Sequence, residues 1–209
     1  MEAQGKNFIF DVAQEFVVRV PHPDFADKKA CRLRFPSDEE WAARSRRNVQ
    51  VRKNLGRDKF RTDAPNAAAE DLALFEKIRI DKDGPTFDEA EASVCIAKLE
   101  TAEVTECERN GNRFTVTLKA PGGITKHEVK MPTLKQISEF GNGSVTPTGR
   151  RDGAEYRIAL EPAARLYDQL EPKPEAYAGA VPIVHKDAVI REIVLQTRKS
   201  IEDDDDPEA

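Results

Sequence analysis

Two stretches of the chain follow one pattern: LRFPSDEEW at residues 33–41 and VKMPTLKQI at residues 129–137. Each alternates apolar and basic residues, then has a proline, a hydroxyl residue, and Glu or Gln three positions after the hydroxyl. Alternation is typical of a strand, and the hydroxyl-to-Glu/Gln spacing is typical of a capping box. Both stretches therefore predict a strand, then a helix whose N-cap is Ser37 or Thr133. The two prolines are 96 residues apart, which indicates that one module occurs twice.

The similarity extends upstream of both stretches. EFVVRV at residues 15–20 matches RFTVTL at residues 113–118, at a spacing of 98, so the loop after the first of these strands is two residues longer. Further upstream, FIF at residues 8–10 matches the alternation of VTEC at residues 104–107, and the hairpin signal Asn110-Gly111 joins the latter to the next strand. Each module is therefore predicted to open as a three-stranded antiparallel β-meander.

The similarity weakens downstream but keeps its order. Residues 74–78 and 166–170 both predict a helix with an apolar stripe. The closing helices match at the original spacing, with start signals at Thr86–Glu89 in the first and at Pro182 in the second. The matched residues of the closing helices are Ala92, Val94 and Leu99 with Ala188, Ile190 and Leu195.

We therefore predict an α+β fold, a tandem duplication of a three-stranded antiparallel β-meander followed by helices. The modules span residues 1–101 and 102–201, and the acidic segment 202–209 is predicted to be a disordered tail. Coincidence is the alternative, because a strand–proline–helix junction is common. Five segments in register favour duplication.

Composition points to small cores. Charged residues make up 34% of the chain and hydrophobic residues 39%, and each module has about 100 residues. Modules of this size are marginally stable alone, so we expect them to pack on one another or on other copies, and self-association stays open.

The cysteines and the N-terminus favour a cytoplasmic location. The N-terminal residues resemble no signal peptide, and no apolar run is long enough to cross a membrane. Cys31, Cys95 and Cys107 are odd in number and widely spaced, which argues against a disulfide framework or a zinc site. Cys95 lies on an apolar helix face and is predicted to be a core residue.

No pattern in the sequence indicates an enzyme, a metal site or a cofactor. None of the common nucleotide-binding, hydrolase or metalloprotease motifs occurs. The three histidines are predicted to lie in a turn (His22), at an exposed strand position (His127) and at a surface helix start (His185). Residues 81–84 are predicted to form a turn between helices. We therefore expect a non-enzymatic protein with no catalytic residues.

A basic run could bind nucleic acid. Its residues are predicted to lie on one helix that ends near Gly56: Arg44, Arg46, Arg47, Arg52, Lys53 and Arg57. Against this, the net charge is −5 and no aromatic residues interleave the run. A solvated helix face, with its cations towards the C-terminus as the helix dipole favours, explains the run more simply. An acidic protein partner is the next choice, and nucleic-acid binding stays as an alternative.

The repeated junction resembles that of bacteriophage tail assembly chaperones. Many small proteins of that class have a β-hairpin or short meander that ends in a basic–apolar–Pro–Thr/Ser step, followed by a capped helix and further amphipathic helices. Here the steps are RFPS at residues 34–37 and KMPT at residues 130–133. The resemblance implies a non-enzymatic protein that keeps the tape measure protein soluble and gathers tail tube subunits around it, in the host cytoplasm. The chain departs from the usual pattern by carrying the module twice in a longer polypeptide.

A structural virion subunit, of the tail tube or a connector, is the alternative that shares these traits. If a partner helix binds, we expect exposed members of the apolar stripes to contact it. Each of these residues also has a competing role in the core. The candidates are Trp41, Val49, Phe75, Leu166, Tyr167 and Ile193.

Overall fold

The structure is a computed structural model that describes residues 8–21, 29–54, 60–148 and 155–204. As the sequence predicts, the fold is α+β, with helices and antiparallel sheets. The described residues form two compact units. The N-unit consists of residues 12–100 and 145–159, and the C-unit of residues 8–11, 101–144 and 160–204, within the described ranges. None of the described helices is long and apolar enough to cross a membrane.

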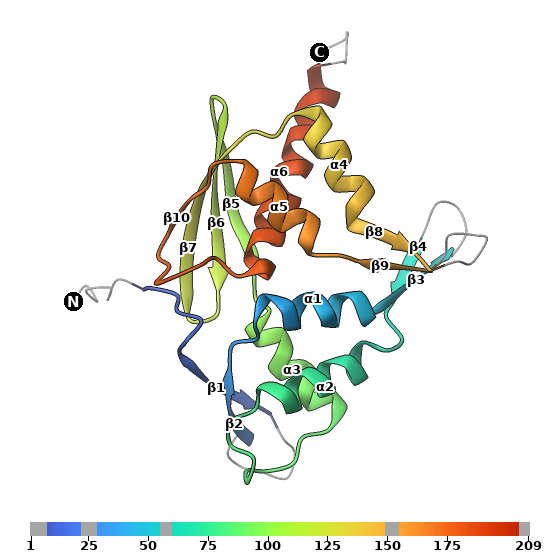
Figure 1. The fold of residues 1–209 in the computed structure, drawn as a ribbon, viewed down its shortest axis with the longest axis vertical. Coiled ribbons are helices and arrows are strands. Elements are labelled where there is room, and N and C mark those ends of the chain that lie inside the picture. Colours follow the sequence, from blue (N-terminus) through green and yellow to red (C-terminus); the bar gives the residue numbers. More distant parts are fainter. Residues whose placement is uncertain (1–7, 22–28, 55–59, 149–154, 205–209) are drawn as a thin grey trace. The chain divides into compact units, whose positions relative to one another are not determined.

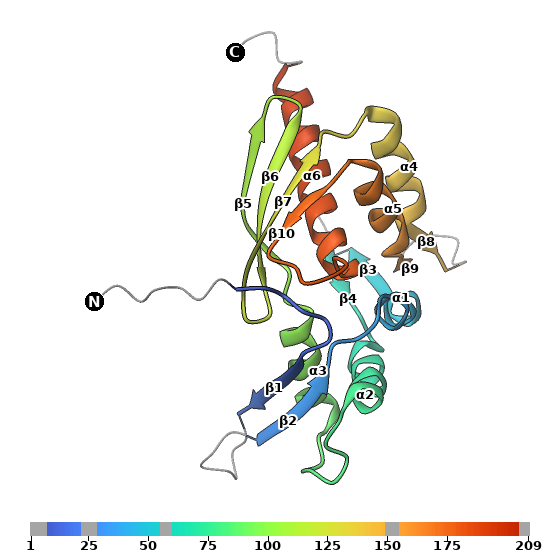
Figure 2. The same ribbon diagram turned by 60° about the vertical axis from the view of Figure 1, so that its left-hand side comes forward.

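The C-unit is a four-stranded antiparallel sheet with helices on one face. The strand order is β10-β7-β6-β5; α6 lies against β5 and β6, α5 packs on α6, and α4 lies beside α5 (Figures 1 and 2). The core lies between the sheet and these helices and includes Phe114, Val129 and Tyr167. Its elements are β5 (Glu103–Asn110), β6 (Arg113–Ala120), β7 (Gly123–Lys130), α4 (Leu134–Ser144), α5 (Glu161–Gln169), β10 (Lys173–Glu175) and α6 (Ile183–Asp204).

The N-unit combines a β-hairpin, three helices and a second sheet. Helix α3 packs on β1 and α2, and α1 packs on α2 and β9. The second sheet has the order β4-β3-β9-β8, so it joins two short hairpins that are far apart in the sequence. The elements are β1 (Glu15–Val20), β2 (Lys29–Arg34), α1 (Asp38–Arg47), β3 (Val49–Asn54), β4 (Phe60–Asp63), α2 (Ala67–Ile78), α3 (Glu89–Leu99), β8 (Val145–Pro147) and β9 (Glu155–Ile158).

The hairpins that open the two modules pair in the same register. Glu15 faces Arg34 in β1–β2, and Arg113 faces Lys130 in β6–β7. The equivalent residues are 98 and 96 positions apart, as in the sequence. Alternate residues of the second strand are buried at matching positions in both hairpins, because the side chains of a strand point alternately to its two faces. These are Cys31 and Leu33 in β2, and His127 and Val129 in β7.

Both hairpins lead into a capping box with the same geometry. In α1 the Ser37 Oγ accepts a hydrogen bond from the Glu40 amide at 3.3 Å, and the Glu40 carboxylate accepts one from the Ser37 amide at 2.9 Å. Thr133 and Gln136 form the same two bonds at 3.3 and 2.9 Å before α4. The residue after each box, Trp41 or Ile137, is buried. The predicted N-caps are therefore confirmed.

Apart from β10, which lies between α5 and α6 and has no counterpart among the described strands of the first module, the modules keep the same order of elements after the first helix. Each continues with a short hairpin (β3–β4 or β8–β9), a second helix (α2 or α5) and a closing helix (α3 or α6). The second helices match at a spacing of 92 residues, as predicted. Their equivalent residues are all buried: Leu74, Phe75 and Ile78 in α2, and Leu166, Tyr167 and Leu170 in α5.

The first module lacks the third strand that the sequence predicted. In the described residues β1 pairs only with β2, whereas Phe10 forms a single parallel bridge with Tyr177 in the C-unit. The Phe10 amide donates to the Ala176 carbonyl at 2.8 Å, and its ring lies 4.8 Å from that of His185. Burial of this ring in the C-unit places residues 8–11 there and removes them from the first meander.

Two helix boundaries also differ from the prediction. The basic helix ends at Arg47 and not near Gly56, and strand β3 follows it. The Asn66 side chain accepts from the Val49 amide at 2.9 Å and donates to the Arg47 carbonyl at 2.7 Å, which supplies partners for the backbone at this exit. Helix α3 begins after a capping box of Asp88 and Glu91, two residues beyond the predicted signal.

The closing helices match at a spacing of 98 residues and not 96. The buried stripe of α3 coincides at this spacing with a buried stripe of α6. The predicted spacing of 96 instead matches Val94, which is 39% exposed, with the buried Ile190, and the buried Leu99 with Leu195, which is 47% exposed. The two stripes are Ala92, Cys95, Ile96 and Leu99, and Ile190, Ile193, Val194 and Thr197. The loop before α6 is thus two residues longer than the repeat predicted.

The two units do not contain the same segments as the two predicted modules. The border between residues 100 and 101 lies one residue before the predicted one, but residues 145–159 of the second module lie in the N-unit and residues 8–11 of the first lie in the C-unit. Helix α6 continues through residues 202–204 of the predicted tail, and residues 205–209 lie outside the described part of the chain.

Loss of either N-cap should destabilise the protein. Replacing Ser37 or Thr133 by Ala removes a bond to an otherwise unpaired helix amide, so each change should lower the free energy of unfolding by about 1 kcal/mol in chemical denaturation. Ser138→Ala, at an exposed position within α4, is the matched control and should cause no loss. Unchanged stability of both cap variants would contradict the assignment.

Candidate functional site

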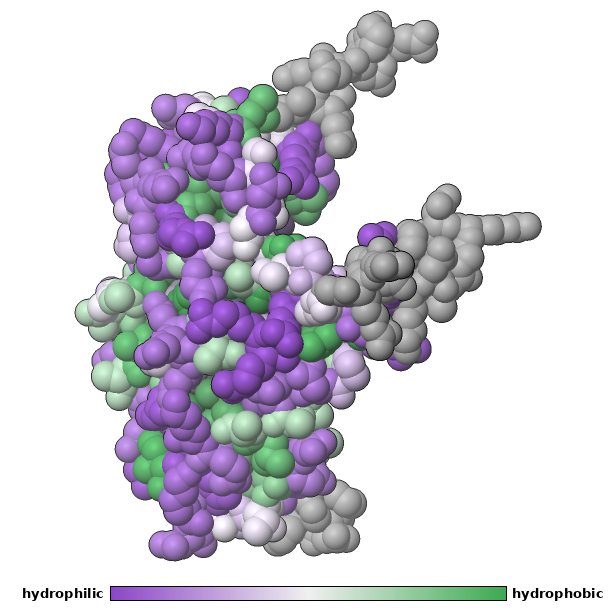
Figure 3. Space-filling model, turned by 45° about the vertical axis from the view of Figure 1, so that its right-hand side comes forward, coloured by the Kyte–Doolittle hydropathy of each residue, from purple (hydrophilic) through white to green (hydrophobic). Residues whose placement is uncertain are grey.

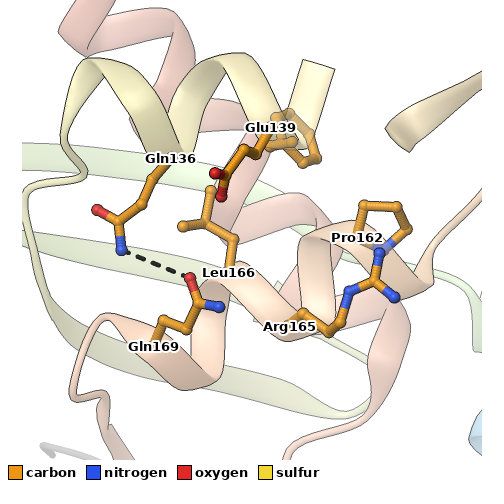
Figure 4. A pocket seen from close by; sticks show the side chains of 7 residues that line it. Gln136, Glu139, Pro162, Arg165, Leu166 and Gln169 are labelled. Atoms are coloured by element: carbon orange, nitrogen blue, oxygen red, sulfur yellow. Dashed lines mark hydrogen bonds between the residues drawn. The ribbon is translucent and has the colours of Figure 1, made fainter. Parts of the chain in front are cut away.

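A groove lies between α4 and α5 on the C-unit (Figure 4). Its volume is about 130 Å³. The residues that line it are three or four positions apart on each helix, a spacing that places them on one helix face. They are Gln136, Glu139 and Phe140 from α4, and Pro162, Arg165, Leu166 and Gln169 from α5.

The groove has an apolar floor and a polar rim. Phe140, Pro162 and Leu166 are buried and form the floor, and the Leu166 side chain points between the two helices in Figure 4. On the rim, the Gln136 amide donates to the Gln169 carbonyl oxygen at 3.5 Å. Glu139 and Arg165, of opposite charge, are also exposed there. The rim therefore offers hydrogen-bonding groups of both kinds around apolar contact area.

The equivalent helix pair of the N-unit, α1 and α2, is bridged by three ion pairs. Arg44 Nε lies 2.6 Å from Asp71 Oδ1, Arg47 Nε lies 2.6 Å from Glu70 Oε2, and Lys77 Nζ lies 3.1 Å from Glu40 Oε1. The repeat spacings of 96 and 92 residues give the equivalent pairs of the C-unit, in the same order: Phe140 with Ala163, Gly143 with Pro162, and Gln136 with Gln169.

The two modules therefore differ most in what lies between their first two helices. In the N-unit the half-buried Arg44 also pairs with Glu100 at 3.0 Å and lies over the Trp41 ring at 5.6 Å, so charge fills this space. In the C-unit an apolar contact and a close helix approach replace the charges, since a Cβ on Gly143 would lie 3.2 Å from Pro162 Cγ. The floor of the groove carries no charge, so an apolar ridge can bind there without desolvating a charged group, whereas Glu139 and Arg165 are charged residues on the rim.

Five of the six residues that the sequence nominated for partner binding are buried, which favours their core role. Trp41 and Phe75 lie in the core of the N-unit, and Tyr167 and Ile193 in that of the C-unit. Leu166 is buried too, but it lines the groove. Val49 is half-buried on β3. Reasoning from single apolar stripes missed Phe140 and Arg165, which a comparison of Arg44 with Phe140 at the repeat spacing would have indicated.

The predicted exposure of His127 and His185 is wrong, because both imidazoles are buried in the C-unit. His127 Nδ1 lies 2.9 Å from the Tyr167 hydroxyl, and its Nε2 lies 3.0 Å from the Tyr177 hydroxyl. The Tyr177 hydroxyl also lies 2.9 Å from His185 Nδ1 and donates to Thr125 Oγ1 at 3.0 Å. The four aromatic side chains thus form one buried hydrogen-bonded network. His22 lies outside the described residues.

Burial keeps this network uncharged. It lowers the pKa of His127 from 6.5 to about 4, and burial with the nearby His127 lowers the pKa of His185 to about 3. Burial also raises the pKa of the Tyr167 and Tyr177 hydroxyls. Neutral rings joined by hydrogen bonds suit a structural role in the core.

The cysteines are thiols in the described structure. Cys95 is buried, as predicted, with its Sγ 3.8 Å from the Sγ of Cys31, which is also buried; Cys107 is half-buried. Contact with the Cys31 thiol raises the pKa of Cys95. No group of three or more His, Cys, Asp or Glu residues in the described ranges could hold a metal ion.

The basic run is divided between elements. Arg44 and Arg47 form ion pairs with α2, Arg52 lies on β3, and Arg57 lies outside the described residues. Within α1 the arginines occupy the last turn and three acidic residues the first, as the helix dipole favours. The continuous basic helix that would contact phosphates is therefore absent from this part of the structure.

The histidine network predicts that the protein loses stability in mild acid. The folded state lowers both histidine pKa values, so the unfolded state takes up more protons below pH 6.5. The free energy of unfolding should fall by about 2 kcal/mol per histidine between pH 7 and pH 5. Urea denaturation at the two pH values measures this. The variant with both His127→Gln and His185→Gln should lose much less over the same interval, and an equal loss would contradict the assignment.

Comparisons with protein-family models, curated proteins and solved structures return no match. What the chain binds must therefore be inferred from the geometry of the units themselves.

Proposed function

We propose that this protein is a non-enzymatic holding protein, similar to a phage tail assembly chaperone, that binds a helical segment of its partner in the α4–α5 groove. The observation that carries the proposal is the replacement of three ion pairs between α1 and α2 by uncharged contacts between α4 and α5. The tape measure protein is the proposed partner. The protein would act in the host cytoplasm.

An amphipathic helix fits the chemistry of this groove. Its apolar ridge would cover Phe140 and Leu166, and its polar flanks would meet Gln136 and Gln169 on the rim. The groove would require only an apolar ridge with polar residues on either side of it, and not one particular sequence. This suits a protein that must hold many segments of a long helical partner. Affinity would come mainly from apolar area removed from water and would change little with salt.

The surface around the groove supports a localised binding site. On the face shown in Figure 3, hydrophilic residues predominate and hydrophobic residues form small separate patches. A partner helix therefore gains apolar contact at defined places, and the groove combines such contact with a concave shape.

Transplanting the ion pairs of the N-unit into the groove should abolish partner binding. The variant combines Gln136→Glu with Gln169→Lys and Gly143→Arg with Pro162→Glu, which supplies two of the three pairs and keeps the capping box, since Glu replaces Gln at its third position. Co-expression with the tape measure protein of the same genome should leave that partner insoluble with the variant and soluble with the wild type.

Lys77→Gln alters the equivalent rim of the N-unit and is the matched control, which should hold the partner as well as the wild type does. Thermal unfolding establishes that each variant is folded. Equal holding by the groove variant would contradict the proposal. Steep loss of wild-type binding with salt would favour a nucleic-acid binder, and recovery of the chain in purified particles would favour a virion subunit.

A further inference from the structure

The second sheet of the N-unit repeats one hairpin twice, side by side. Its order is β4-β3-β9-β8, and each neighbouring pair is antiparallel. By their place in the modules, β8 is the equivalent of β3, and β9 is the equivalent of β4. The inner joint therefore unites the first strand of one hairpin with the second strand of the other. The two outer strands are again one first strand, β8, and one second strand, β4.

The first three residues of β3 are equivalent to the three residues of β8. Val49 to Val51 correspond to Val145 to Pro147 at the repeat spacing of 96 residues. All three residues of β3 are half-buried where β9 pairs with them, whereas all three of β8 are exposed. Val145 is 45% exposed, although it is apolar and lies on an outer strand. Among the described strands, β9 therefore covers the outer edge of β3, whereas no strand pairs with the equivalent edge of β8.

We propose that β8 binds β4 of a second copy of this chain, so that copies associate head to tail by repeating the joint between β3 and β9. The strand directions allow this association. Neighbouring strands of the sheet run in opposite directions, so β4 of a second copy would lie antiparallel to β8. Addition of a strand to an open sheet edge is an established mode of protein association. The occupant follows from the fold itself, since the same joint already exists inside the chain.

The inner joint also predicts the register of the outer one. In the inner joint Gln50 faces Tyr156. Within the hairpins, Val51 faces Asp63 and Pro147 faces Tyr156, so Tyr156 is the equivalent of Asp63. Thr146, the equivalent of Gln50, should therefore face Asp63 of the second copy. Such an association joins unlike surfaces and forms a ring where the rotation closes, or a filament where it does not.

Charge placed on either outer strand should block the association. The average mass of the wild type in sedimentation or light scattering should rise with concentration, whereas Val145→Lys and Thr62→Lys should each stay monomeric. A mixture of these two variants should form dimers and nothing larger, because each keeps one intact edge. Val94→Lys, at an exposed valine of α3, is the matched control and should associate as the wild type does.

Cross-linking tests the register without blocking the edge. Thr146→Cys mixed with Asp63→Cys should form a disulfide-linked dimer on oxidation, because directly opposed residues lie within disulfide distance. Either variant alone should not. A wild type that stays monomeric at every concentration would overturn the proposal, as would a cross-link by Thr146→Cys alone, which would show a symmetric pairing of two β8 strands. The groove lies elsewhere in the chain, so the two proposals can fail separately.

Discussion

The capping box that follows each opening hairpin is the constraint on which the rest of each module depends. The second strand ends three residues before the hydroxyl N-cap, so the first helix begins at a fixed distance from the hairpin, with Trp41 or Ile137 buried one turn in. The position and direction of that helix then determine where the short hairpin that follows it begins. The same cap distances and strand register in both modules show that this constraint holds twice in one chain.

On this shared frame the two modules have different interiors. Between its first two helices the N-unit has the half-buried Arg44 with two carboxylate partners, and loss of these partners would leave its charge uncompensated. The C-unit has Phe140 and Ala163 at the same place. In the C-unit core, His127 and Tyr167 replace Cys31 and Phe75 of the N-unit, so a polar network stands where the other unit has thiol and phenyl groups. One module thus has a groove whose floor is uncharged.

The sequence predicted those parts of the fold that local patterns determine. Strand alternation, the capping boxes and the stripes of α2 and α5 depend on residues a few positions apart. The single bridge of Phe10 and the joint of β3 with β9 depend on partners more than 100 residues away, and three-residue alternation in β3 was too short to distinguish from a continued helix. The histidines look exposed in sequence because their tyrosine partners, which make burial acceptable, lie on other elements. The groove was missed because each apolar stripe was considered singly, although the spacing of 92 residues between α2 and α5 can be read from the sequence.

Hydrogen–deuterium exchange of the chain, alone and with the tape measure protein, tests most directly the claim that the two modules have diverged into a bridged and a binding copy. We predict that the partner slows exchange in α4 and α5, and that exchange in the equivalent helices α1 and α2 does not change. Protection confined to α1 and α2, or no protection in any of the four helices, would contradict the account.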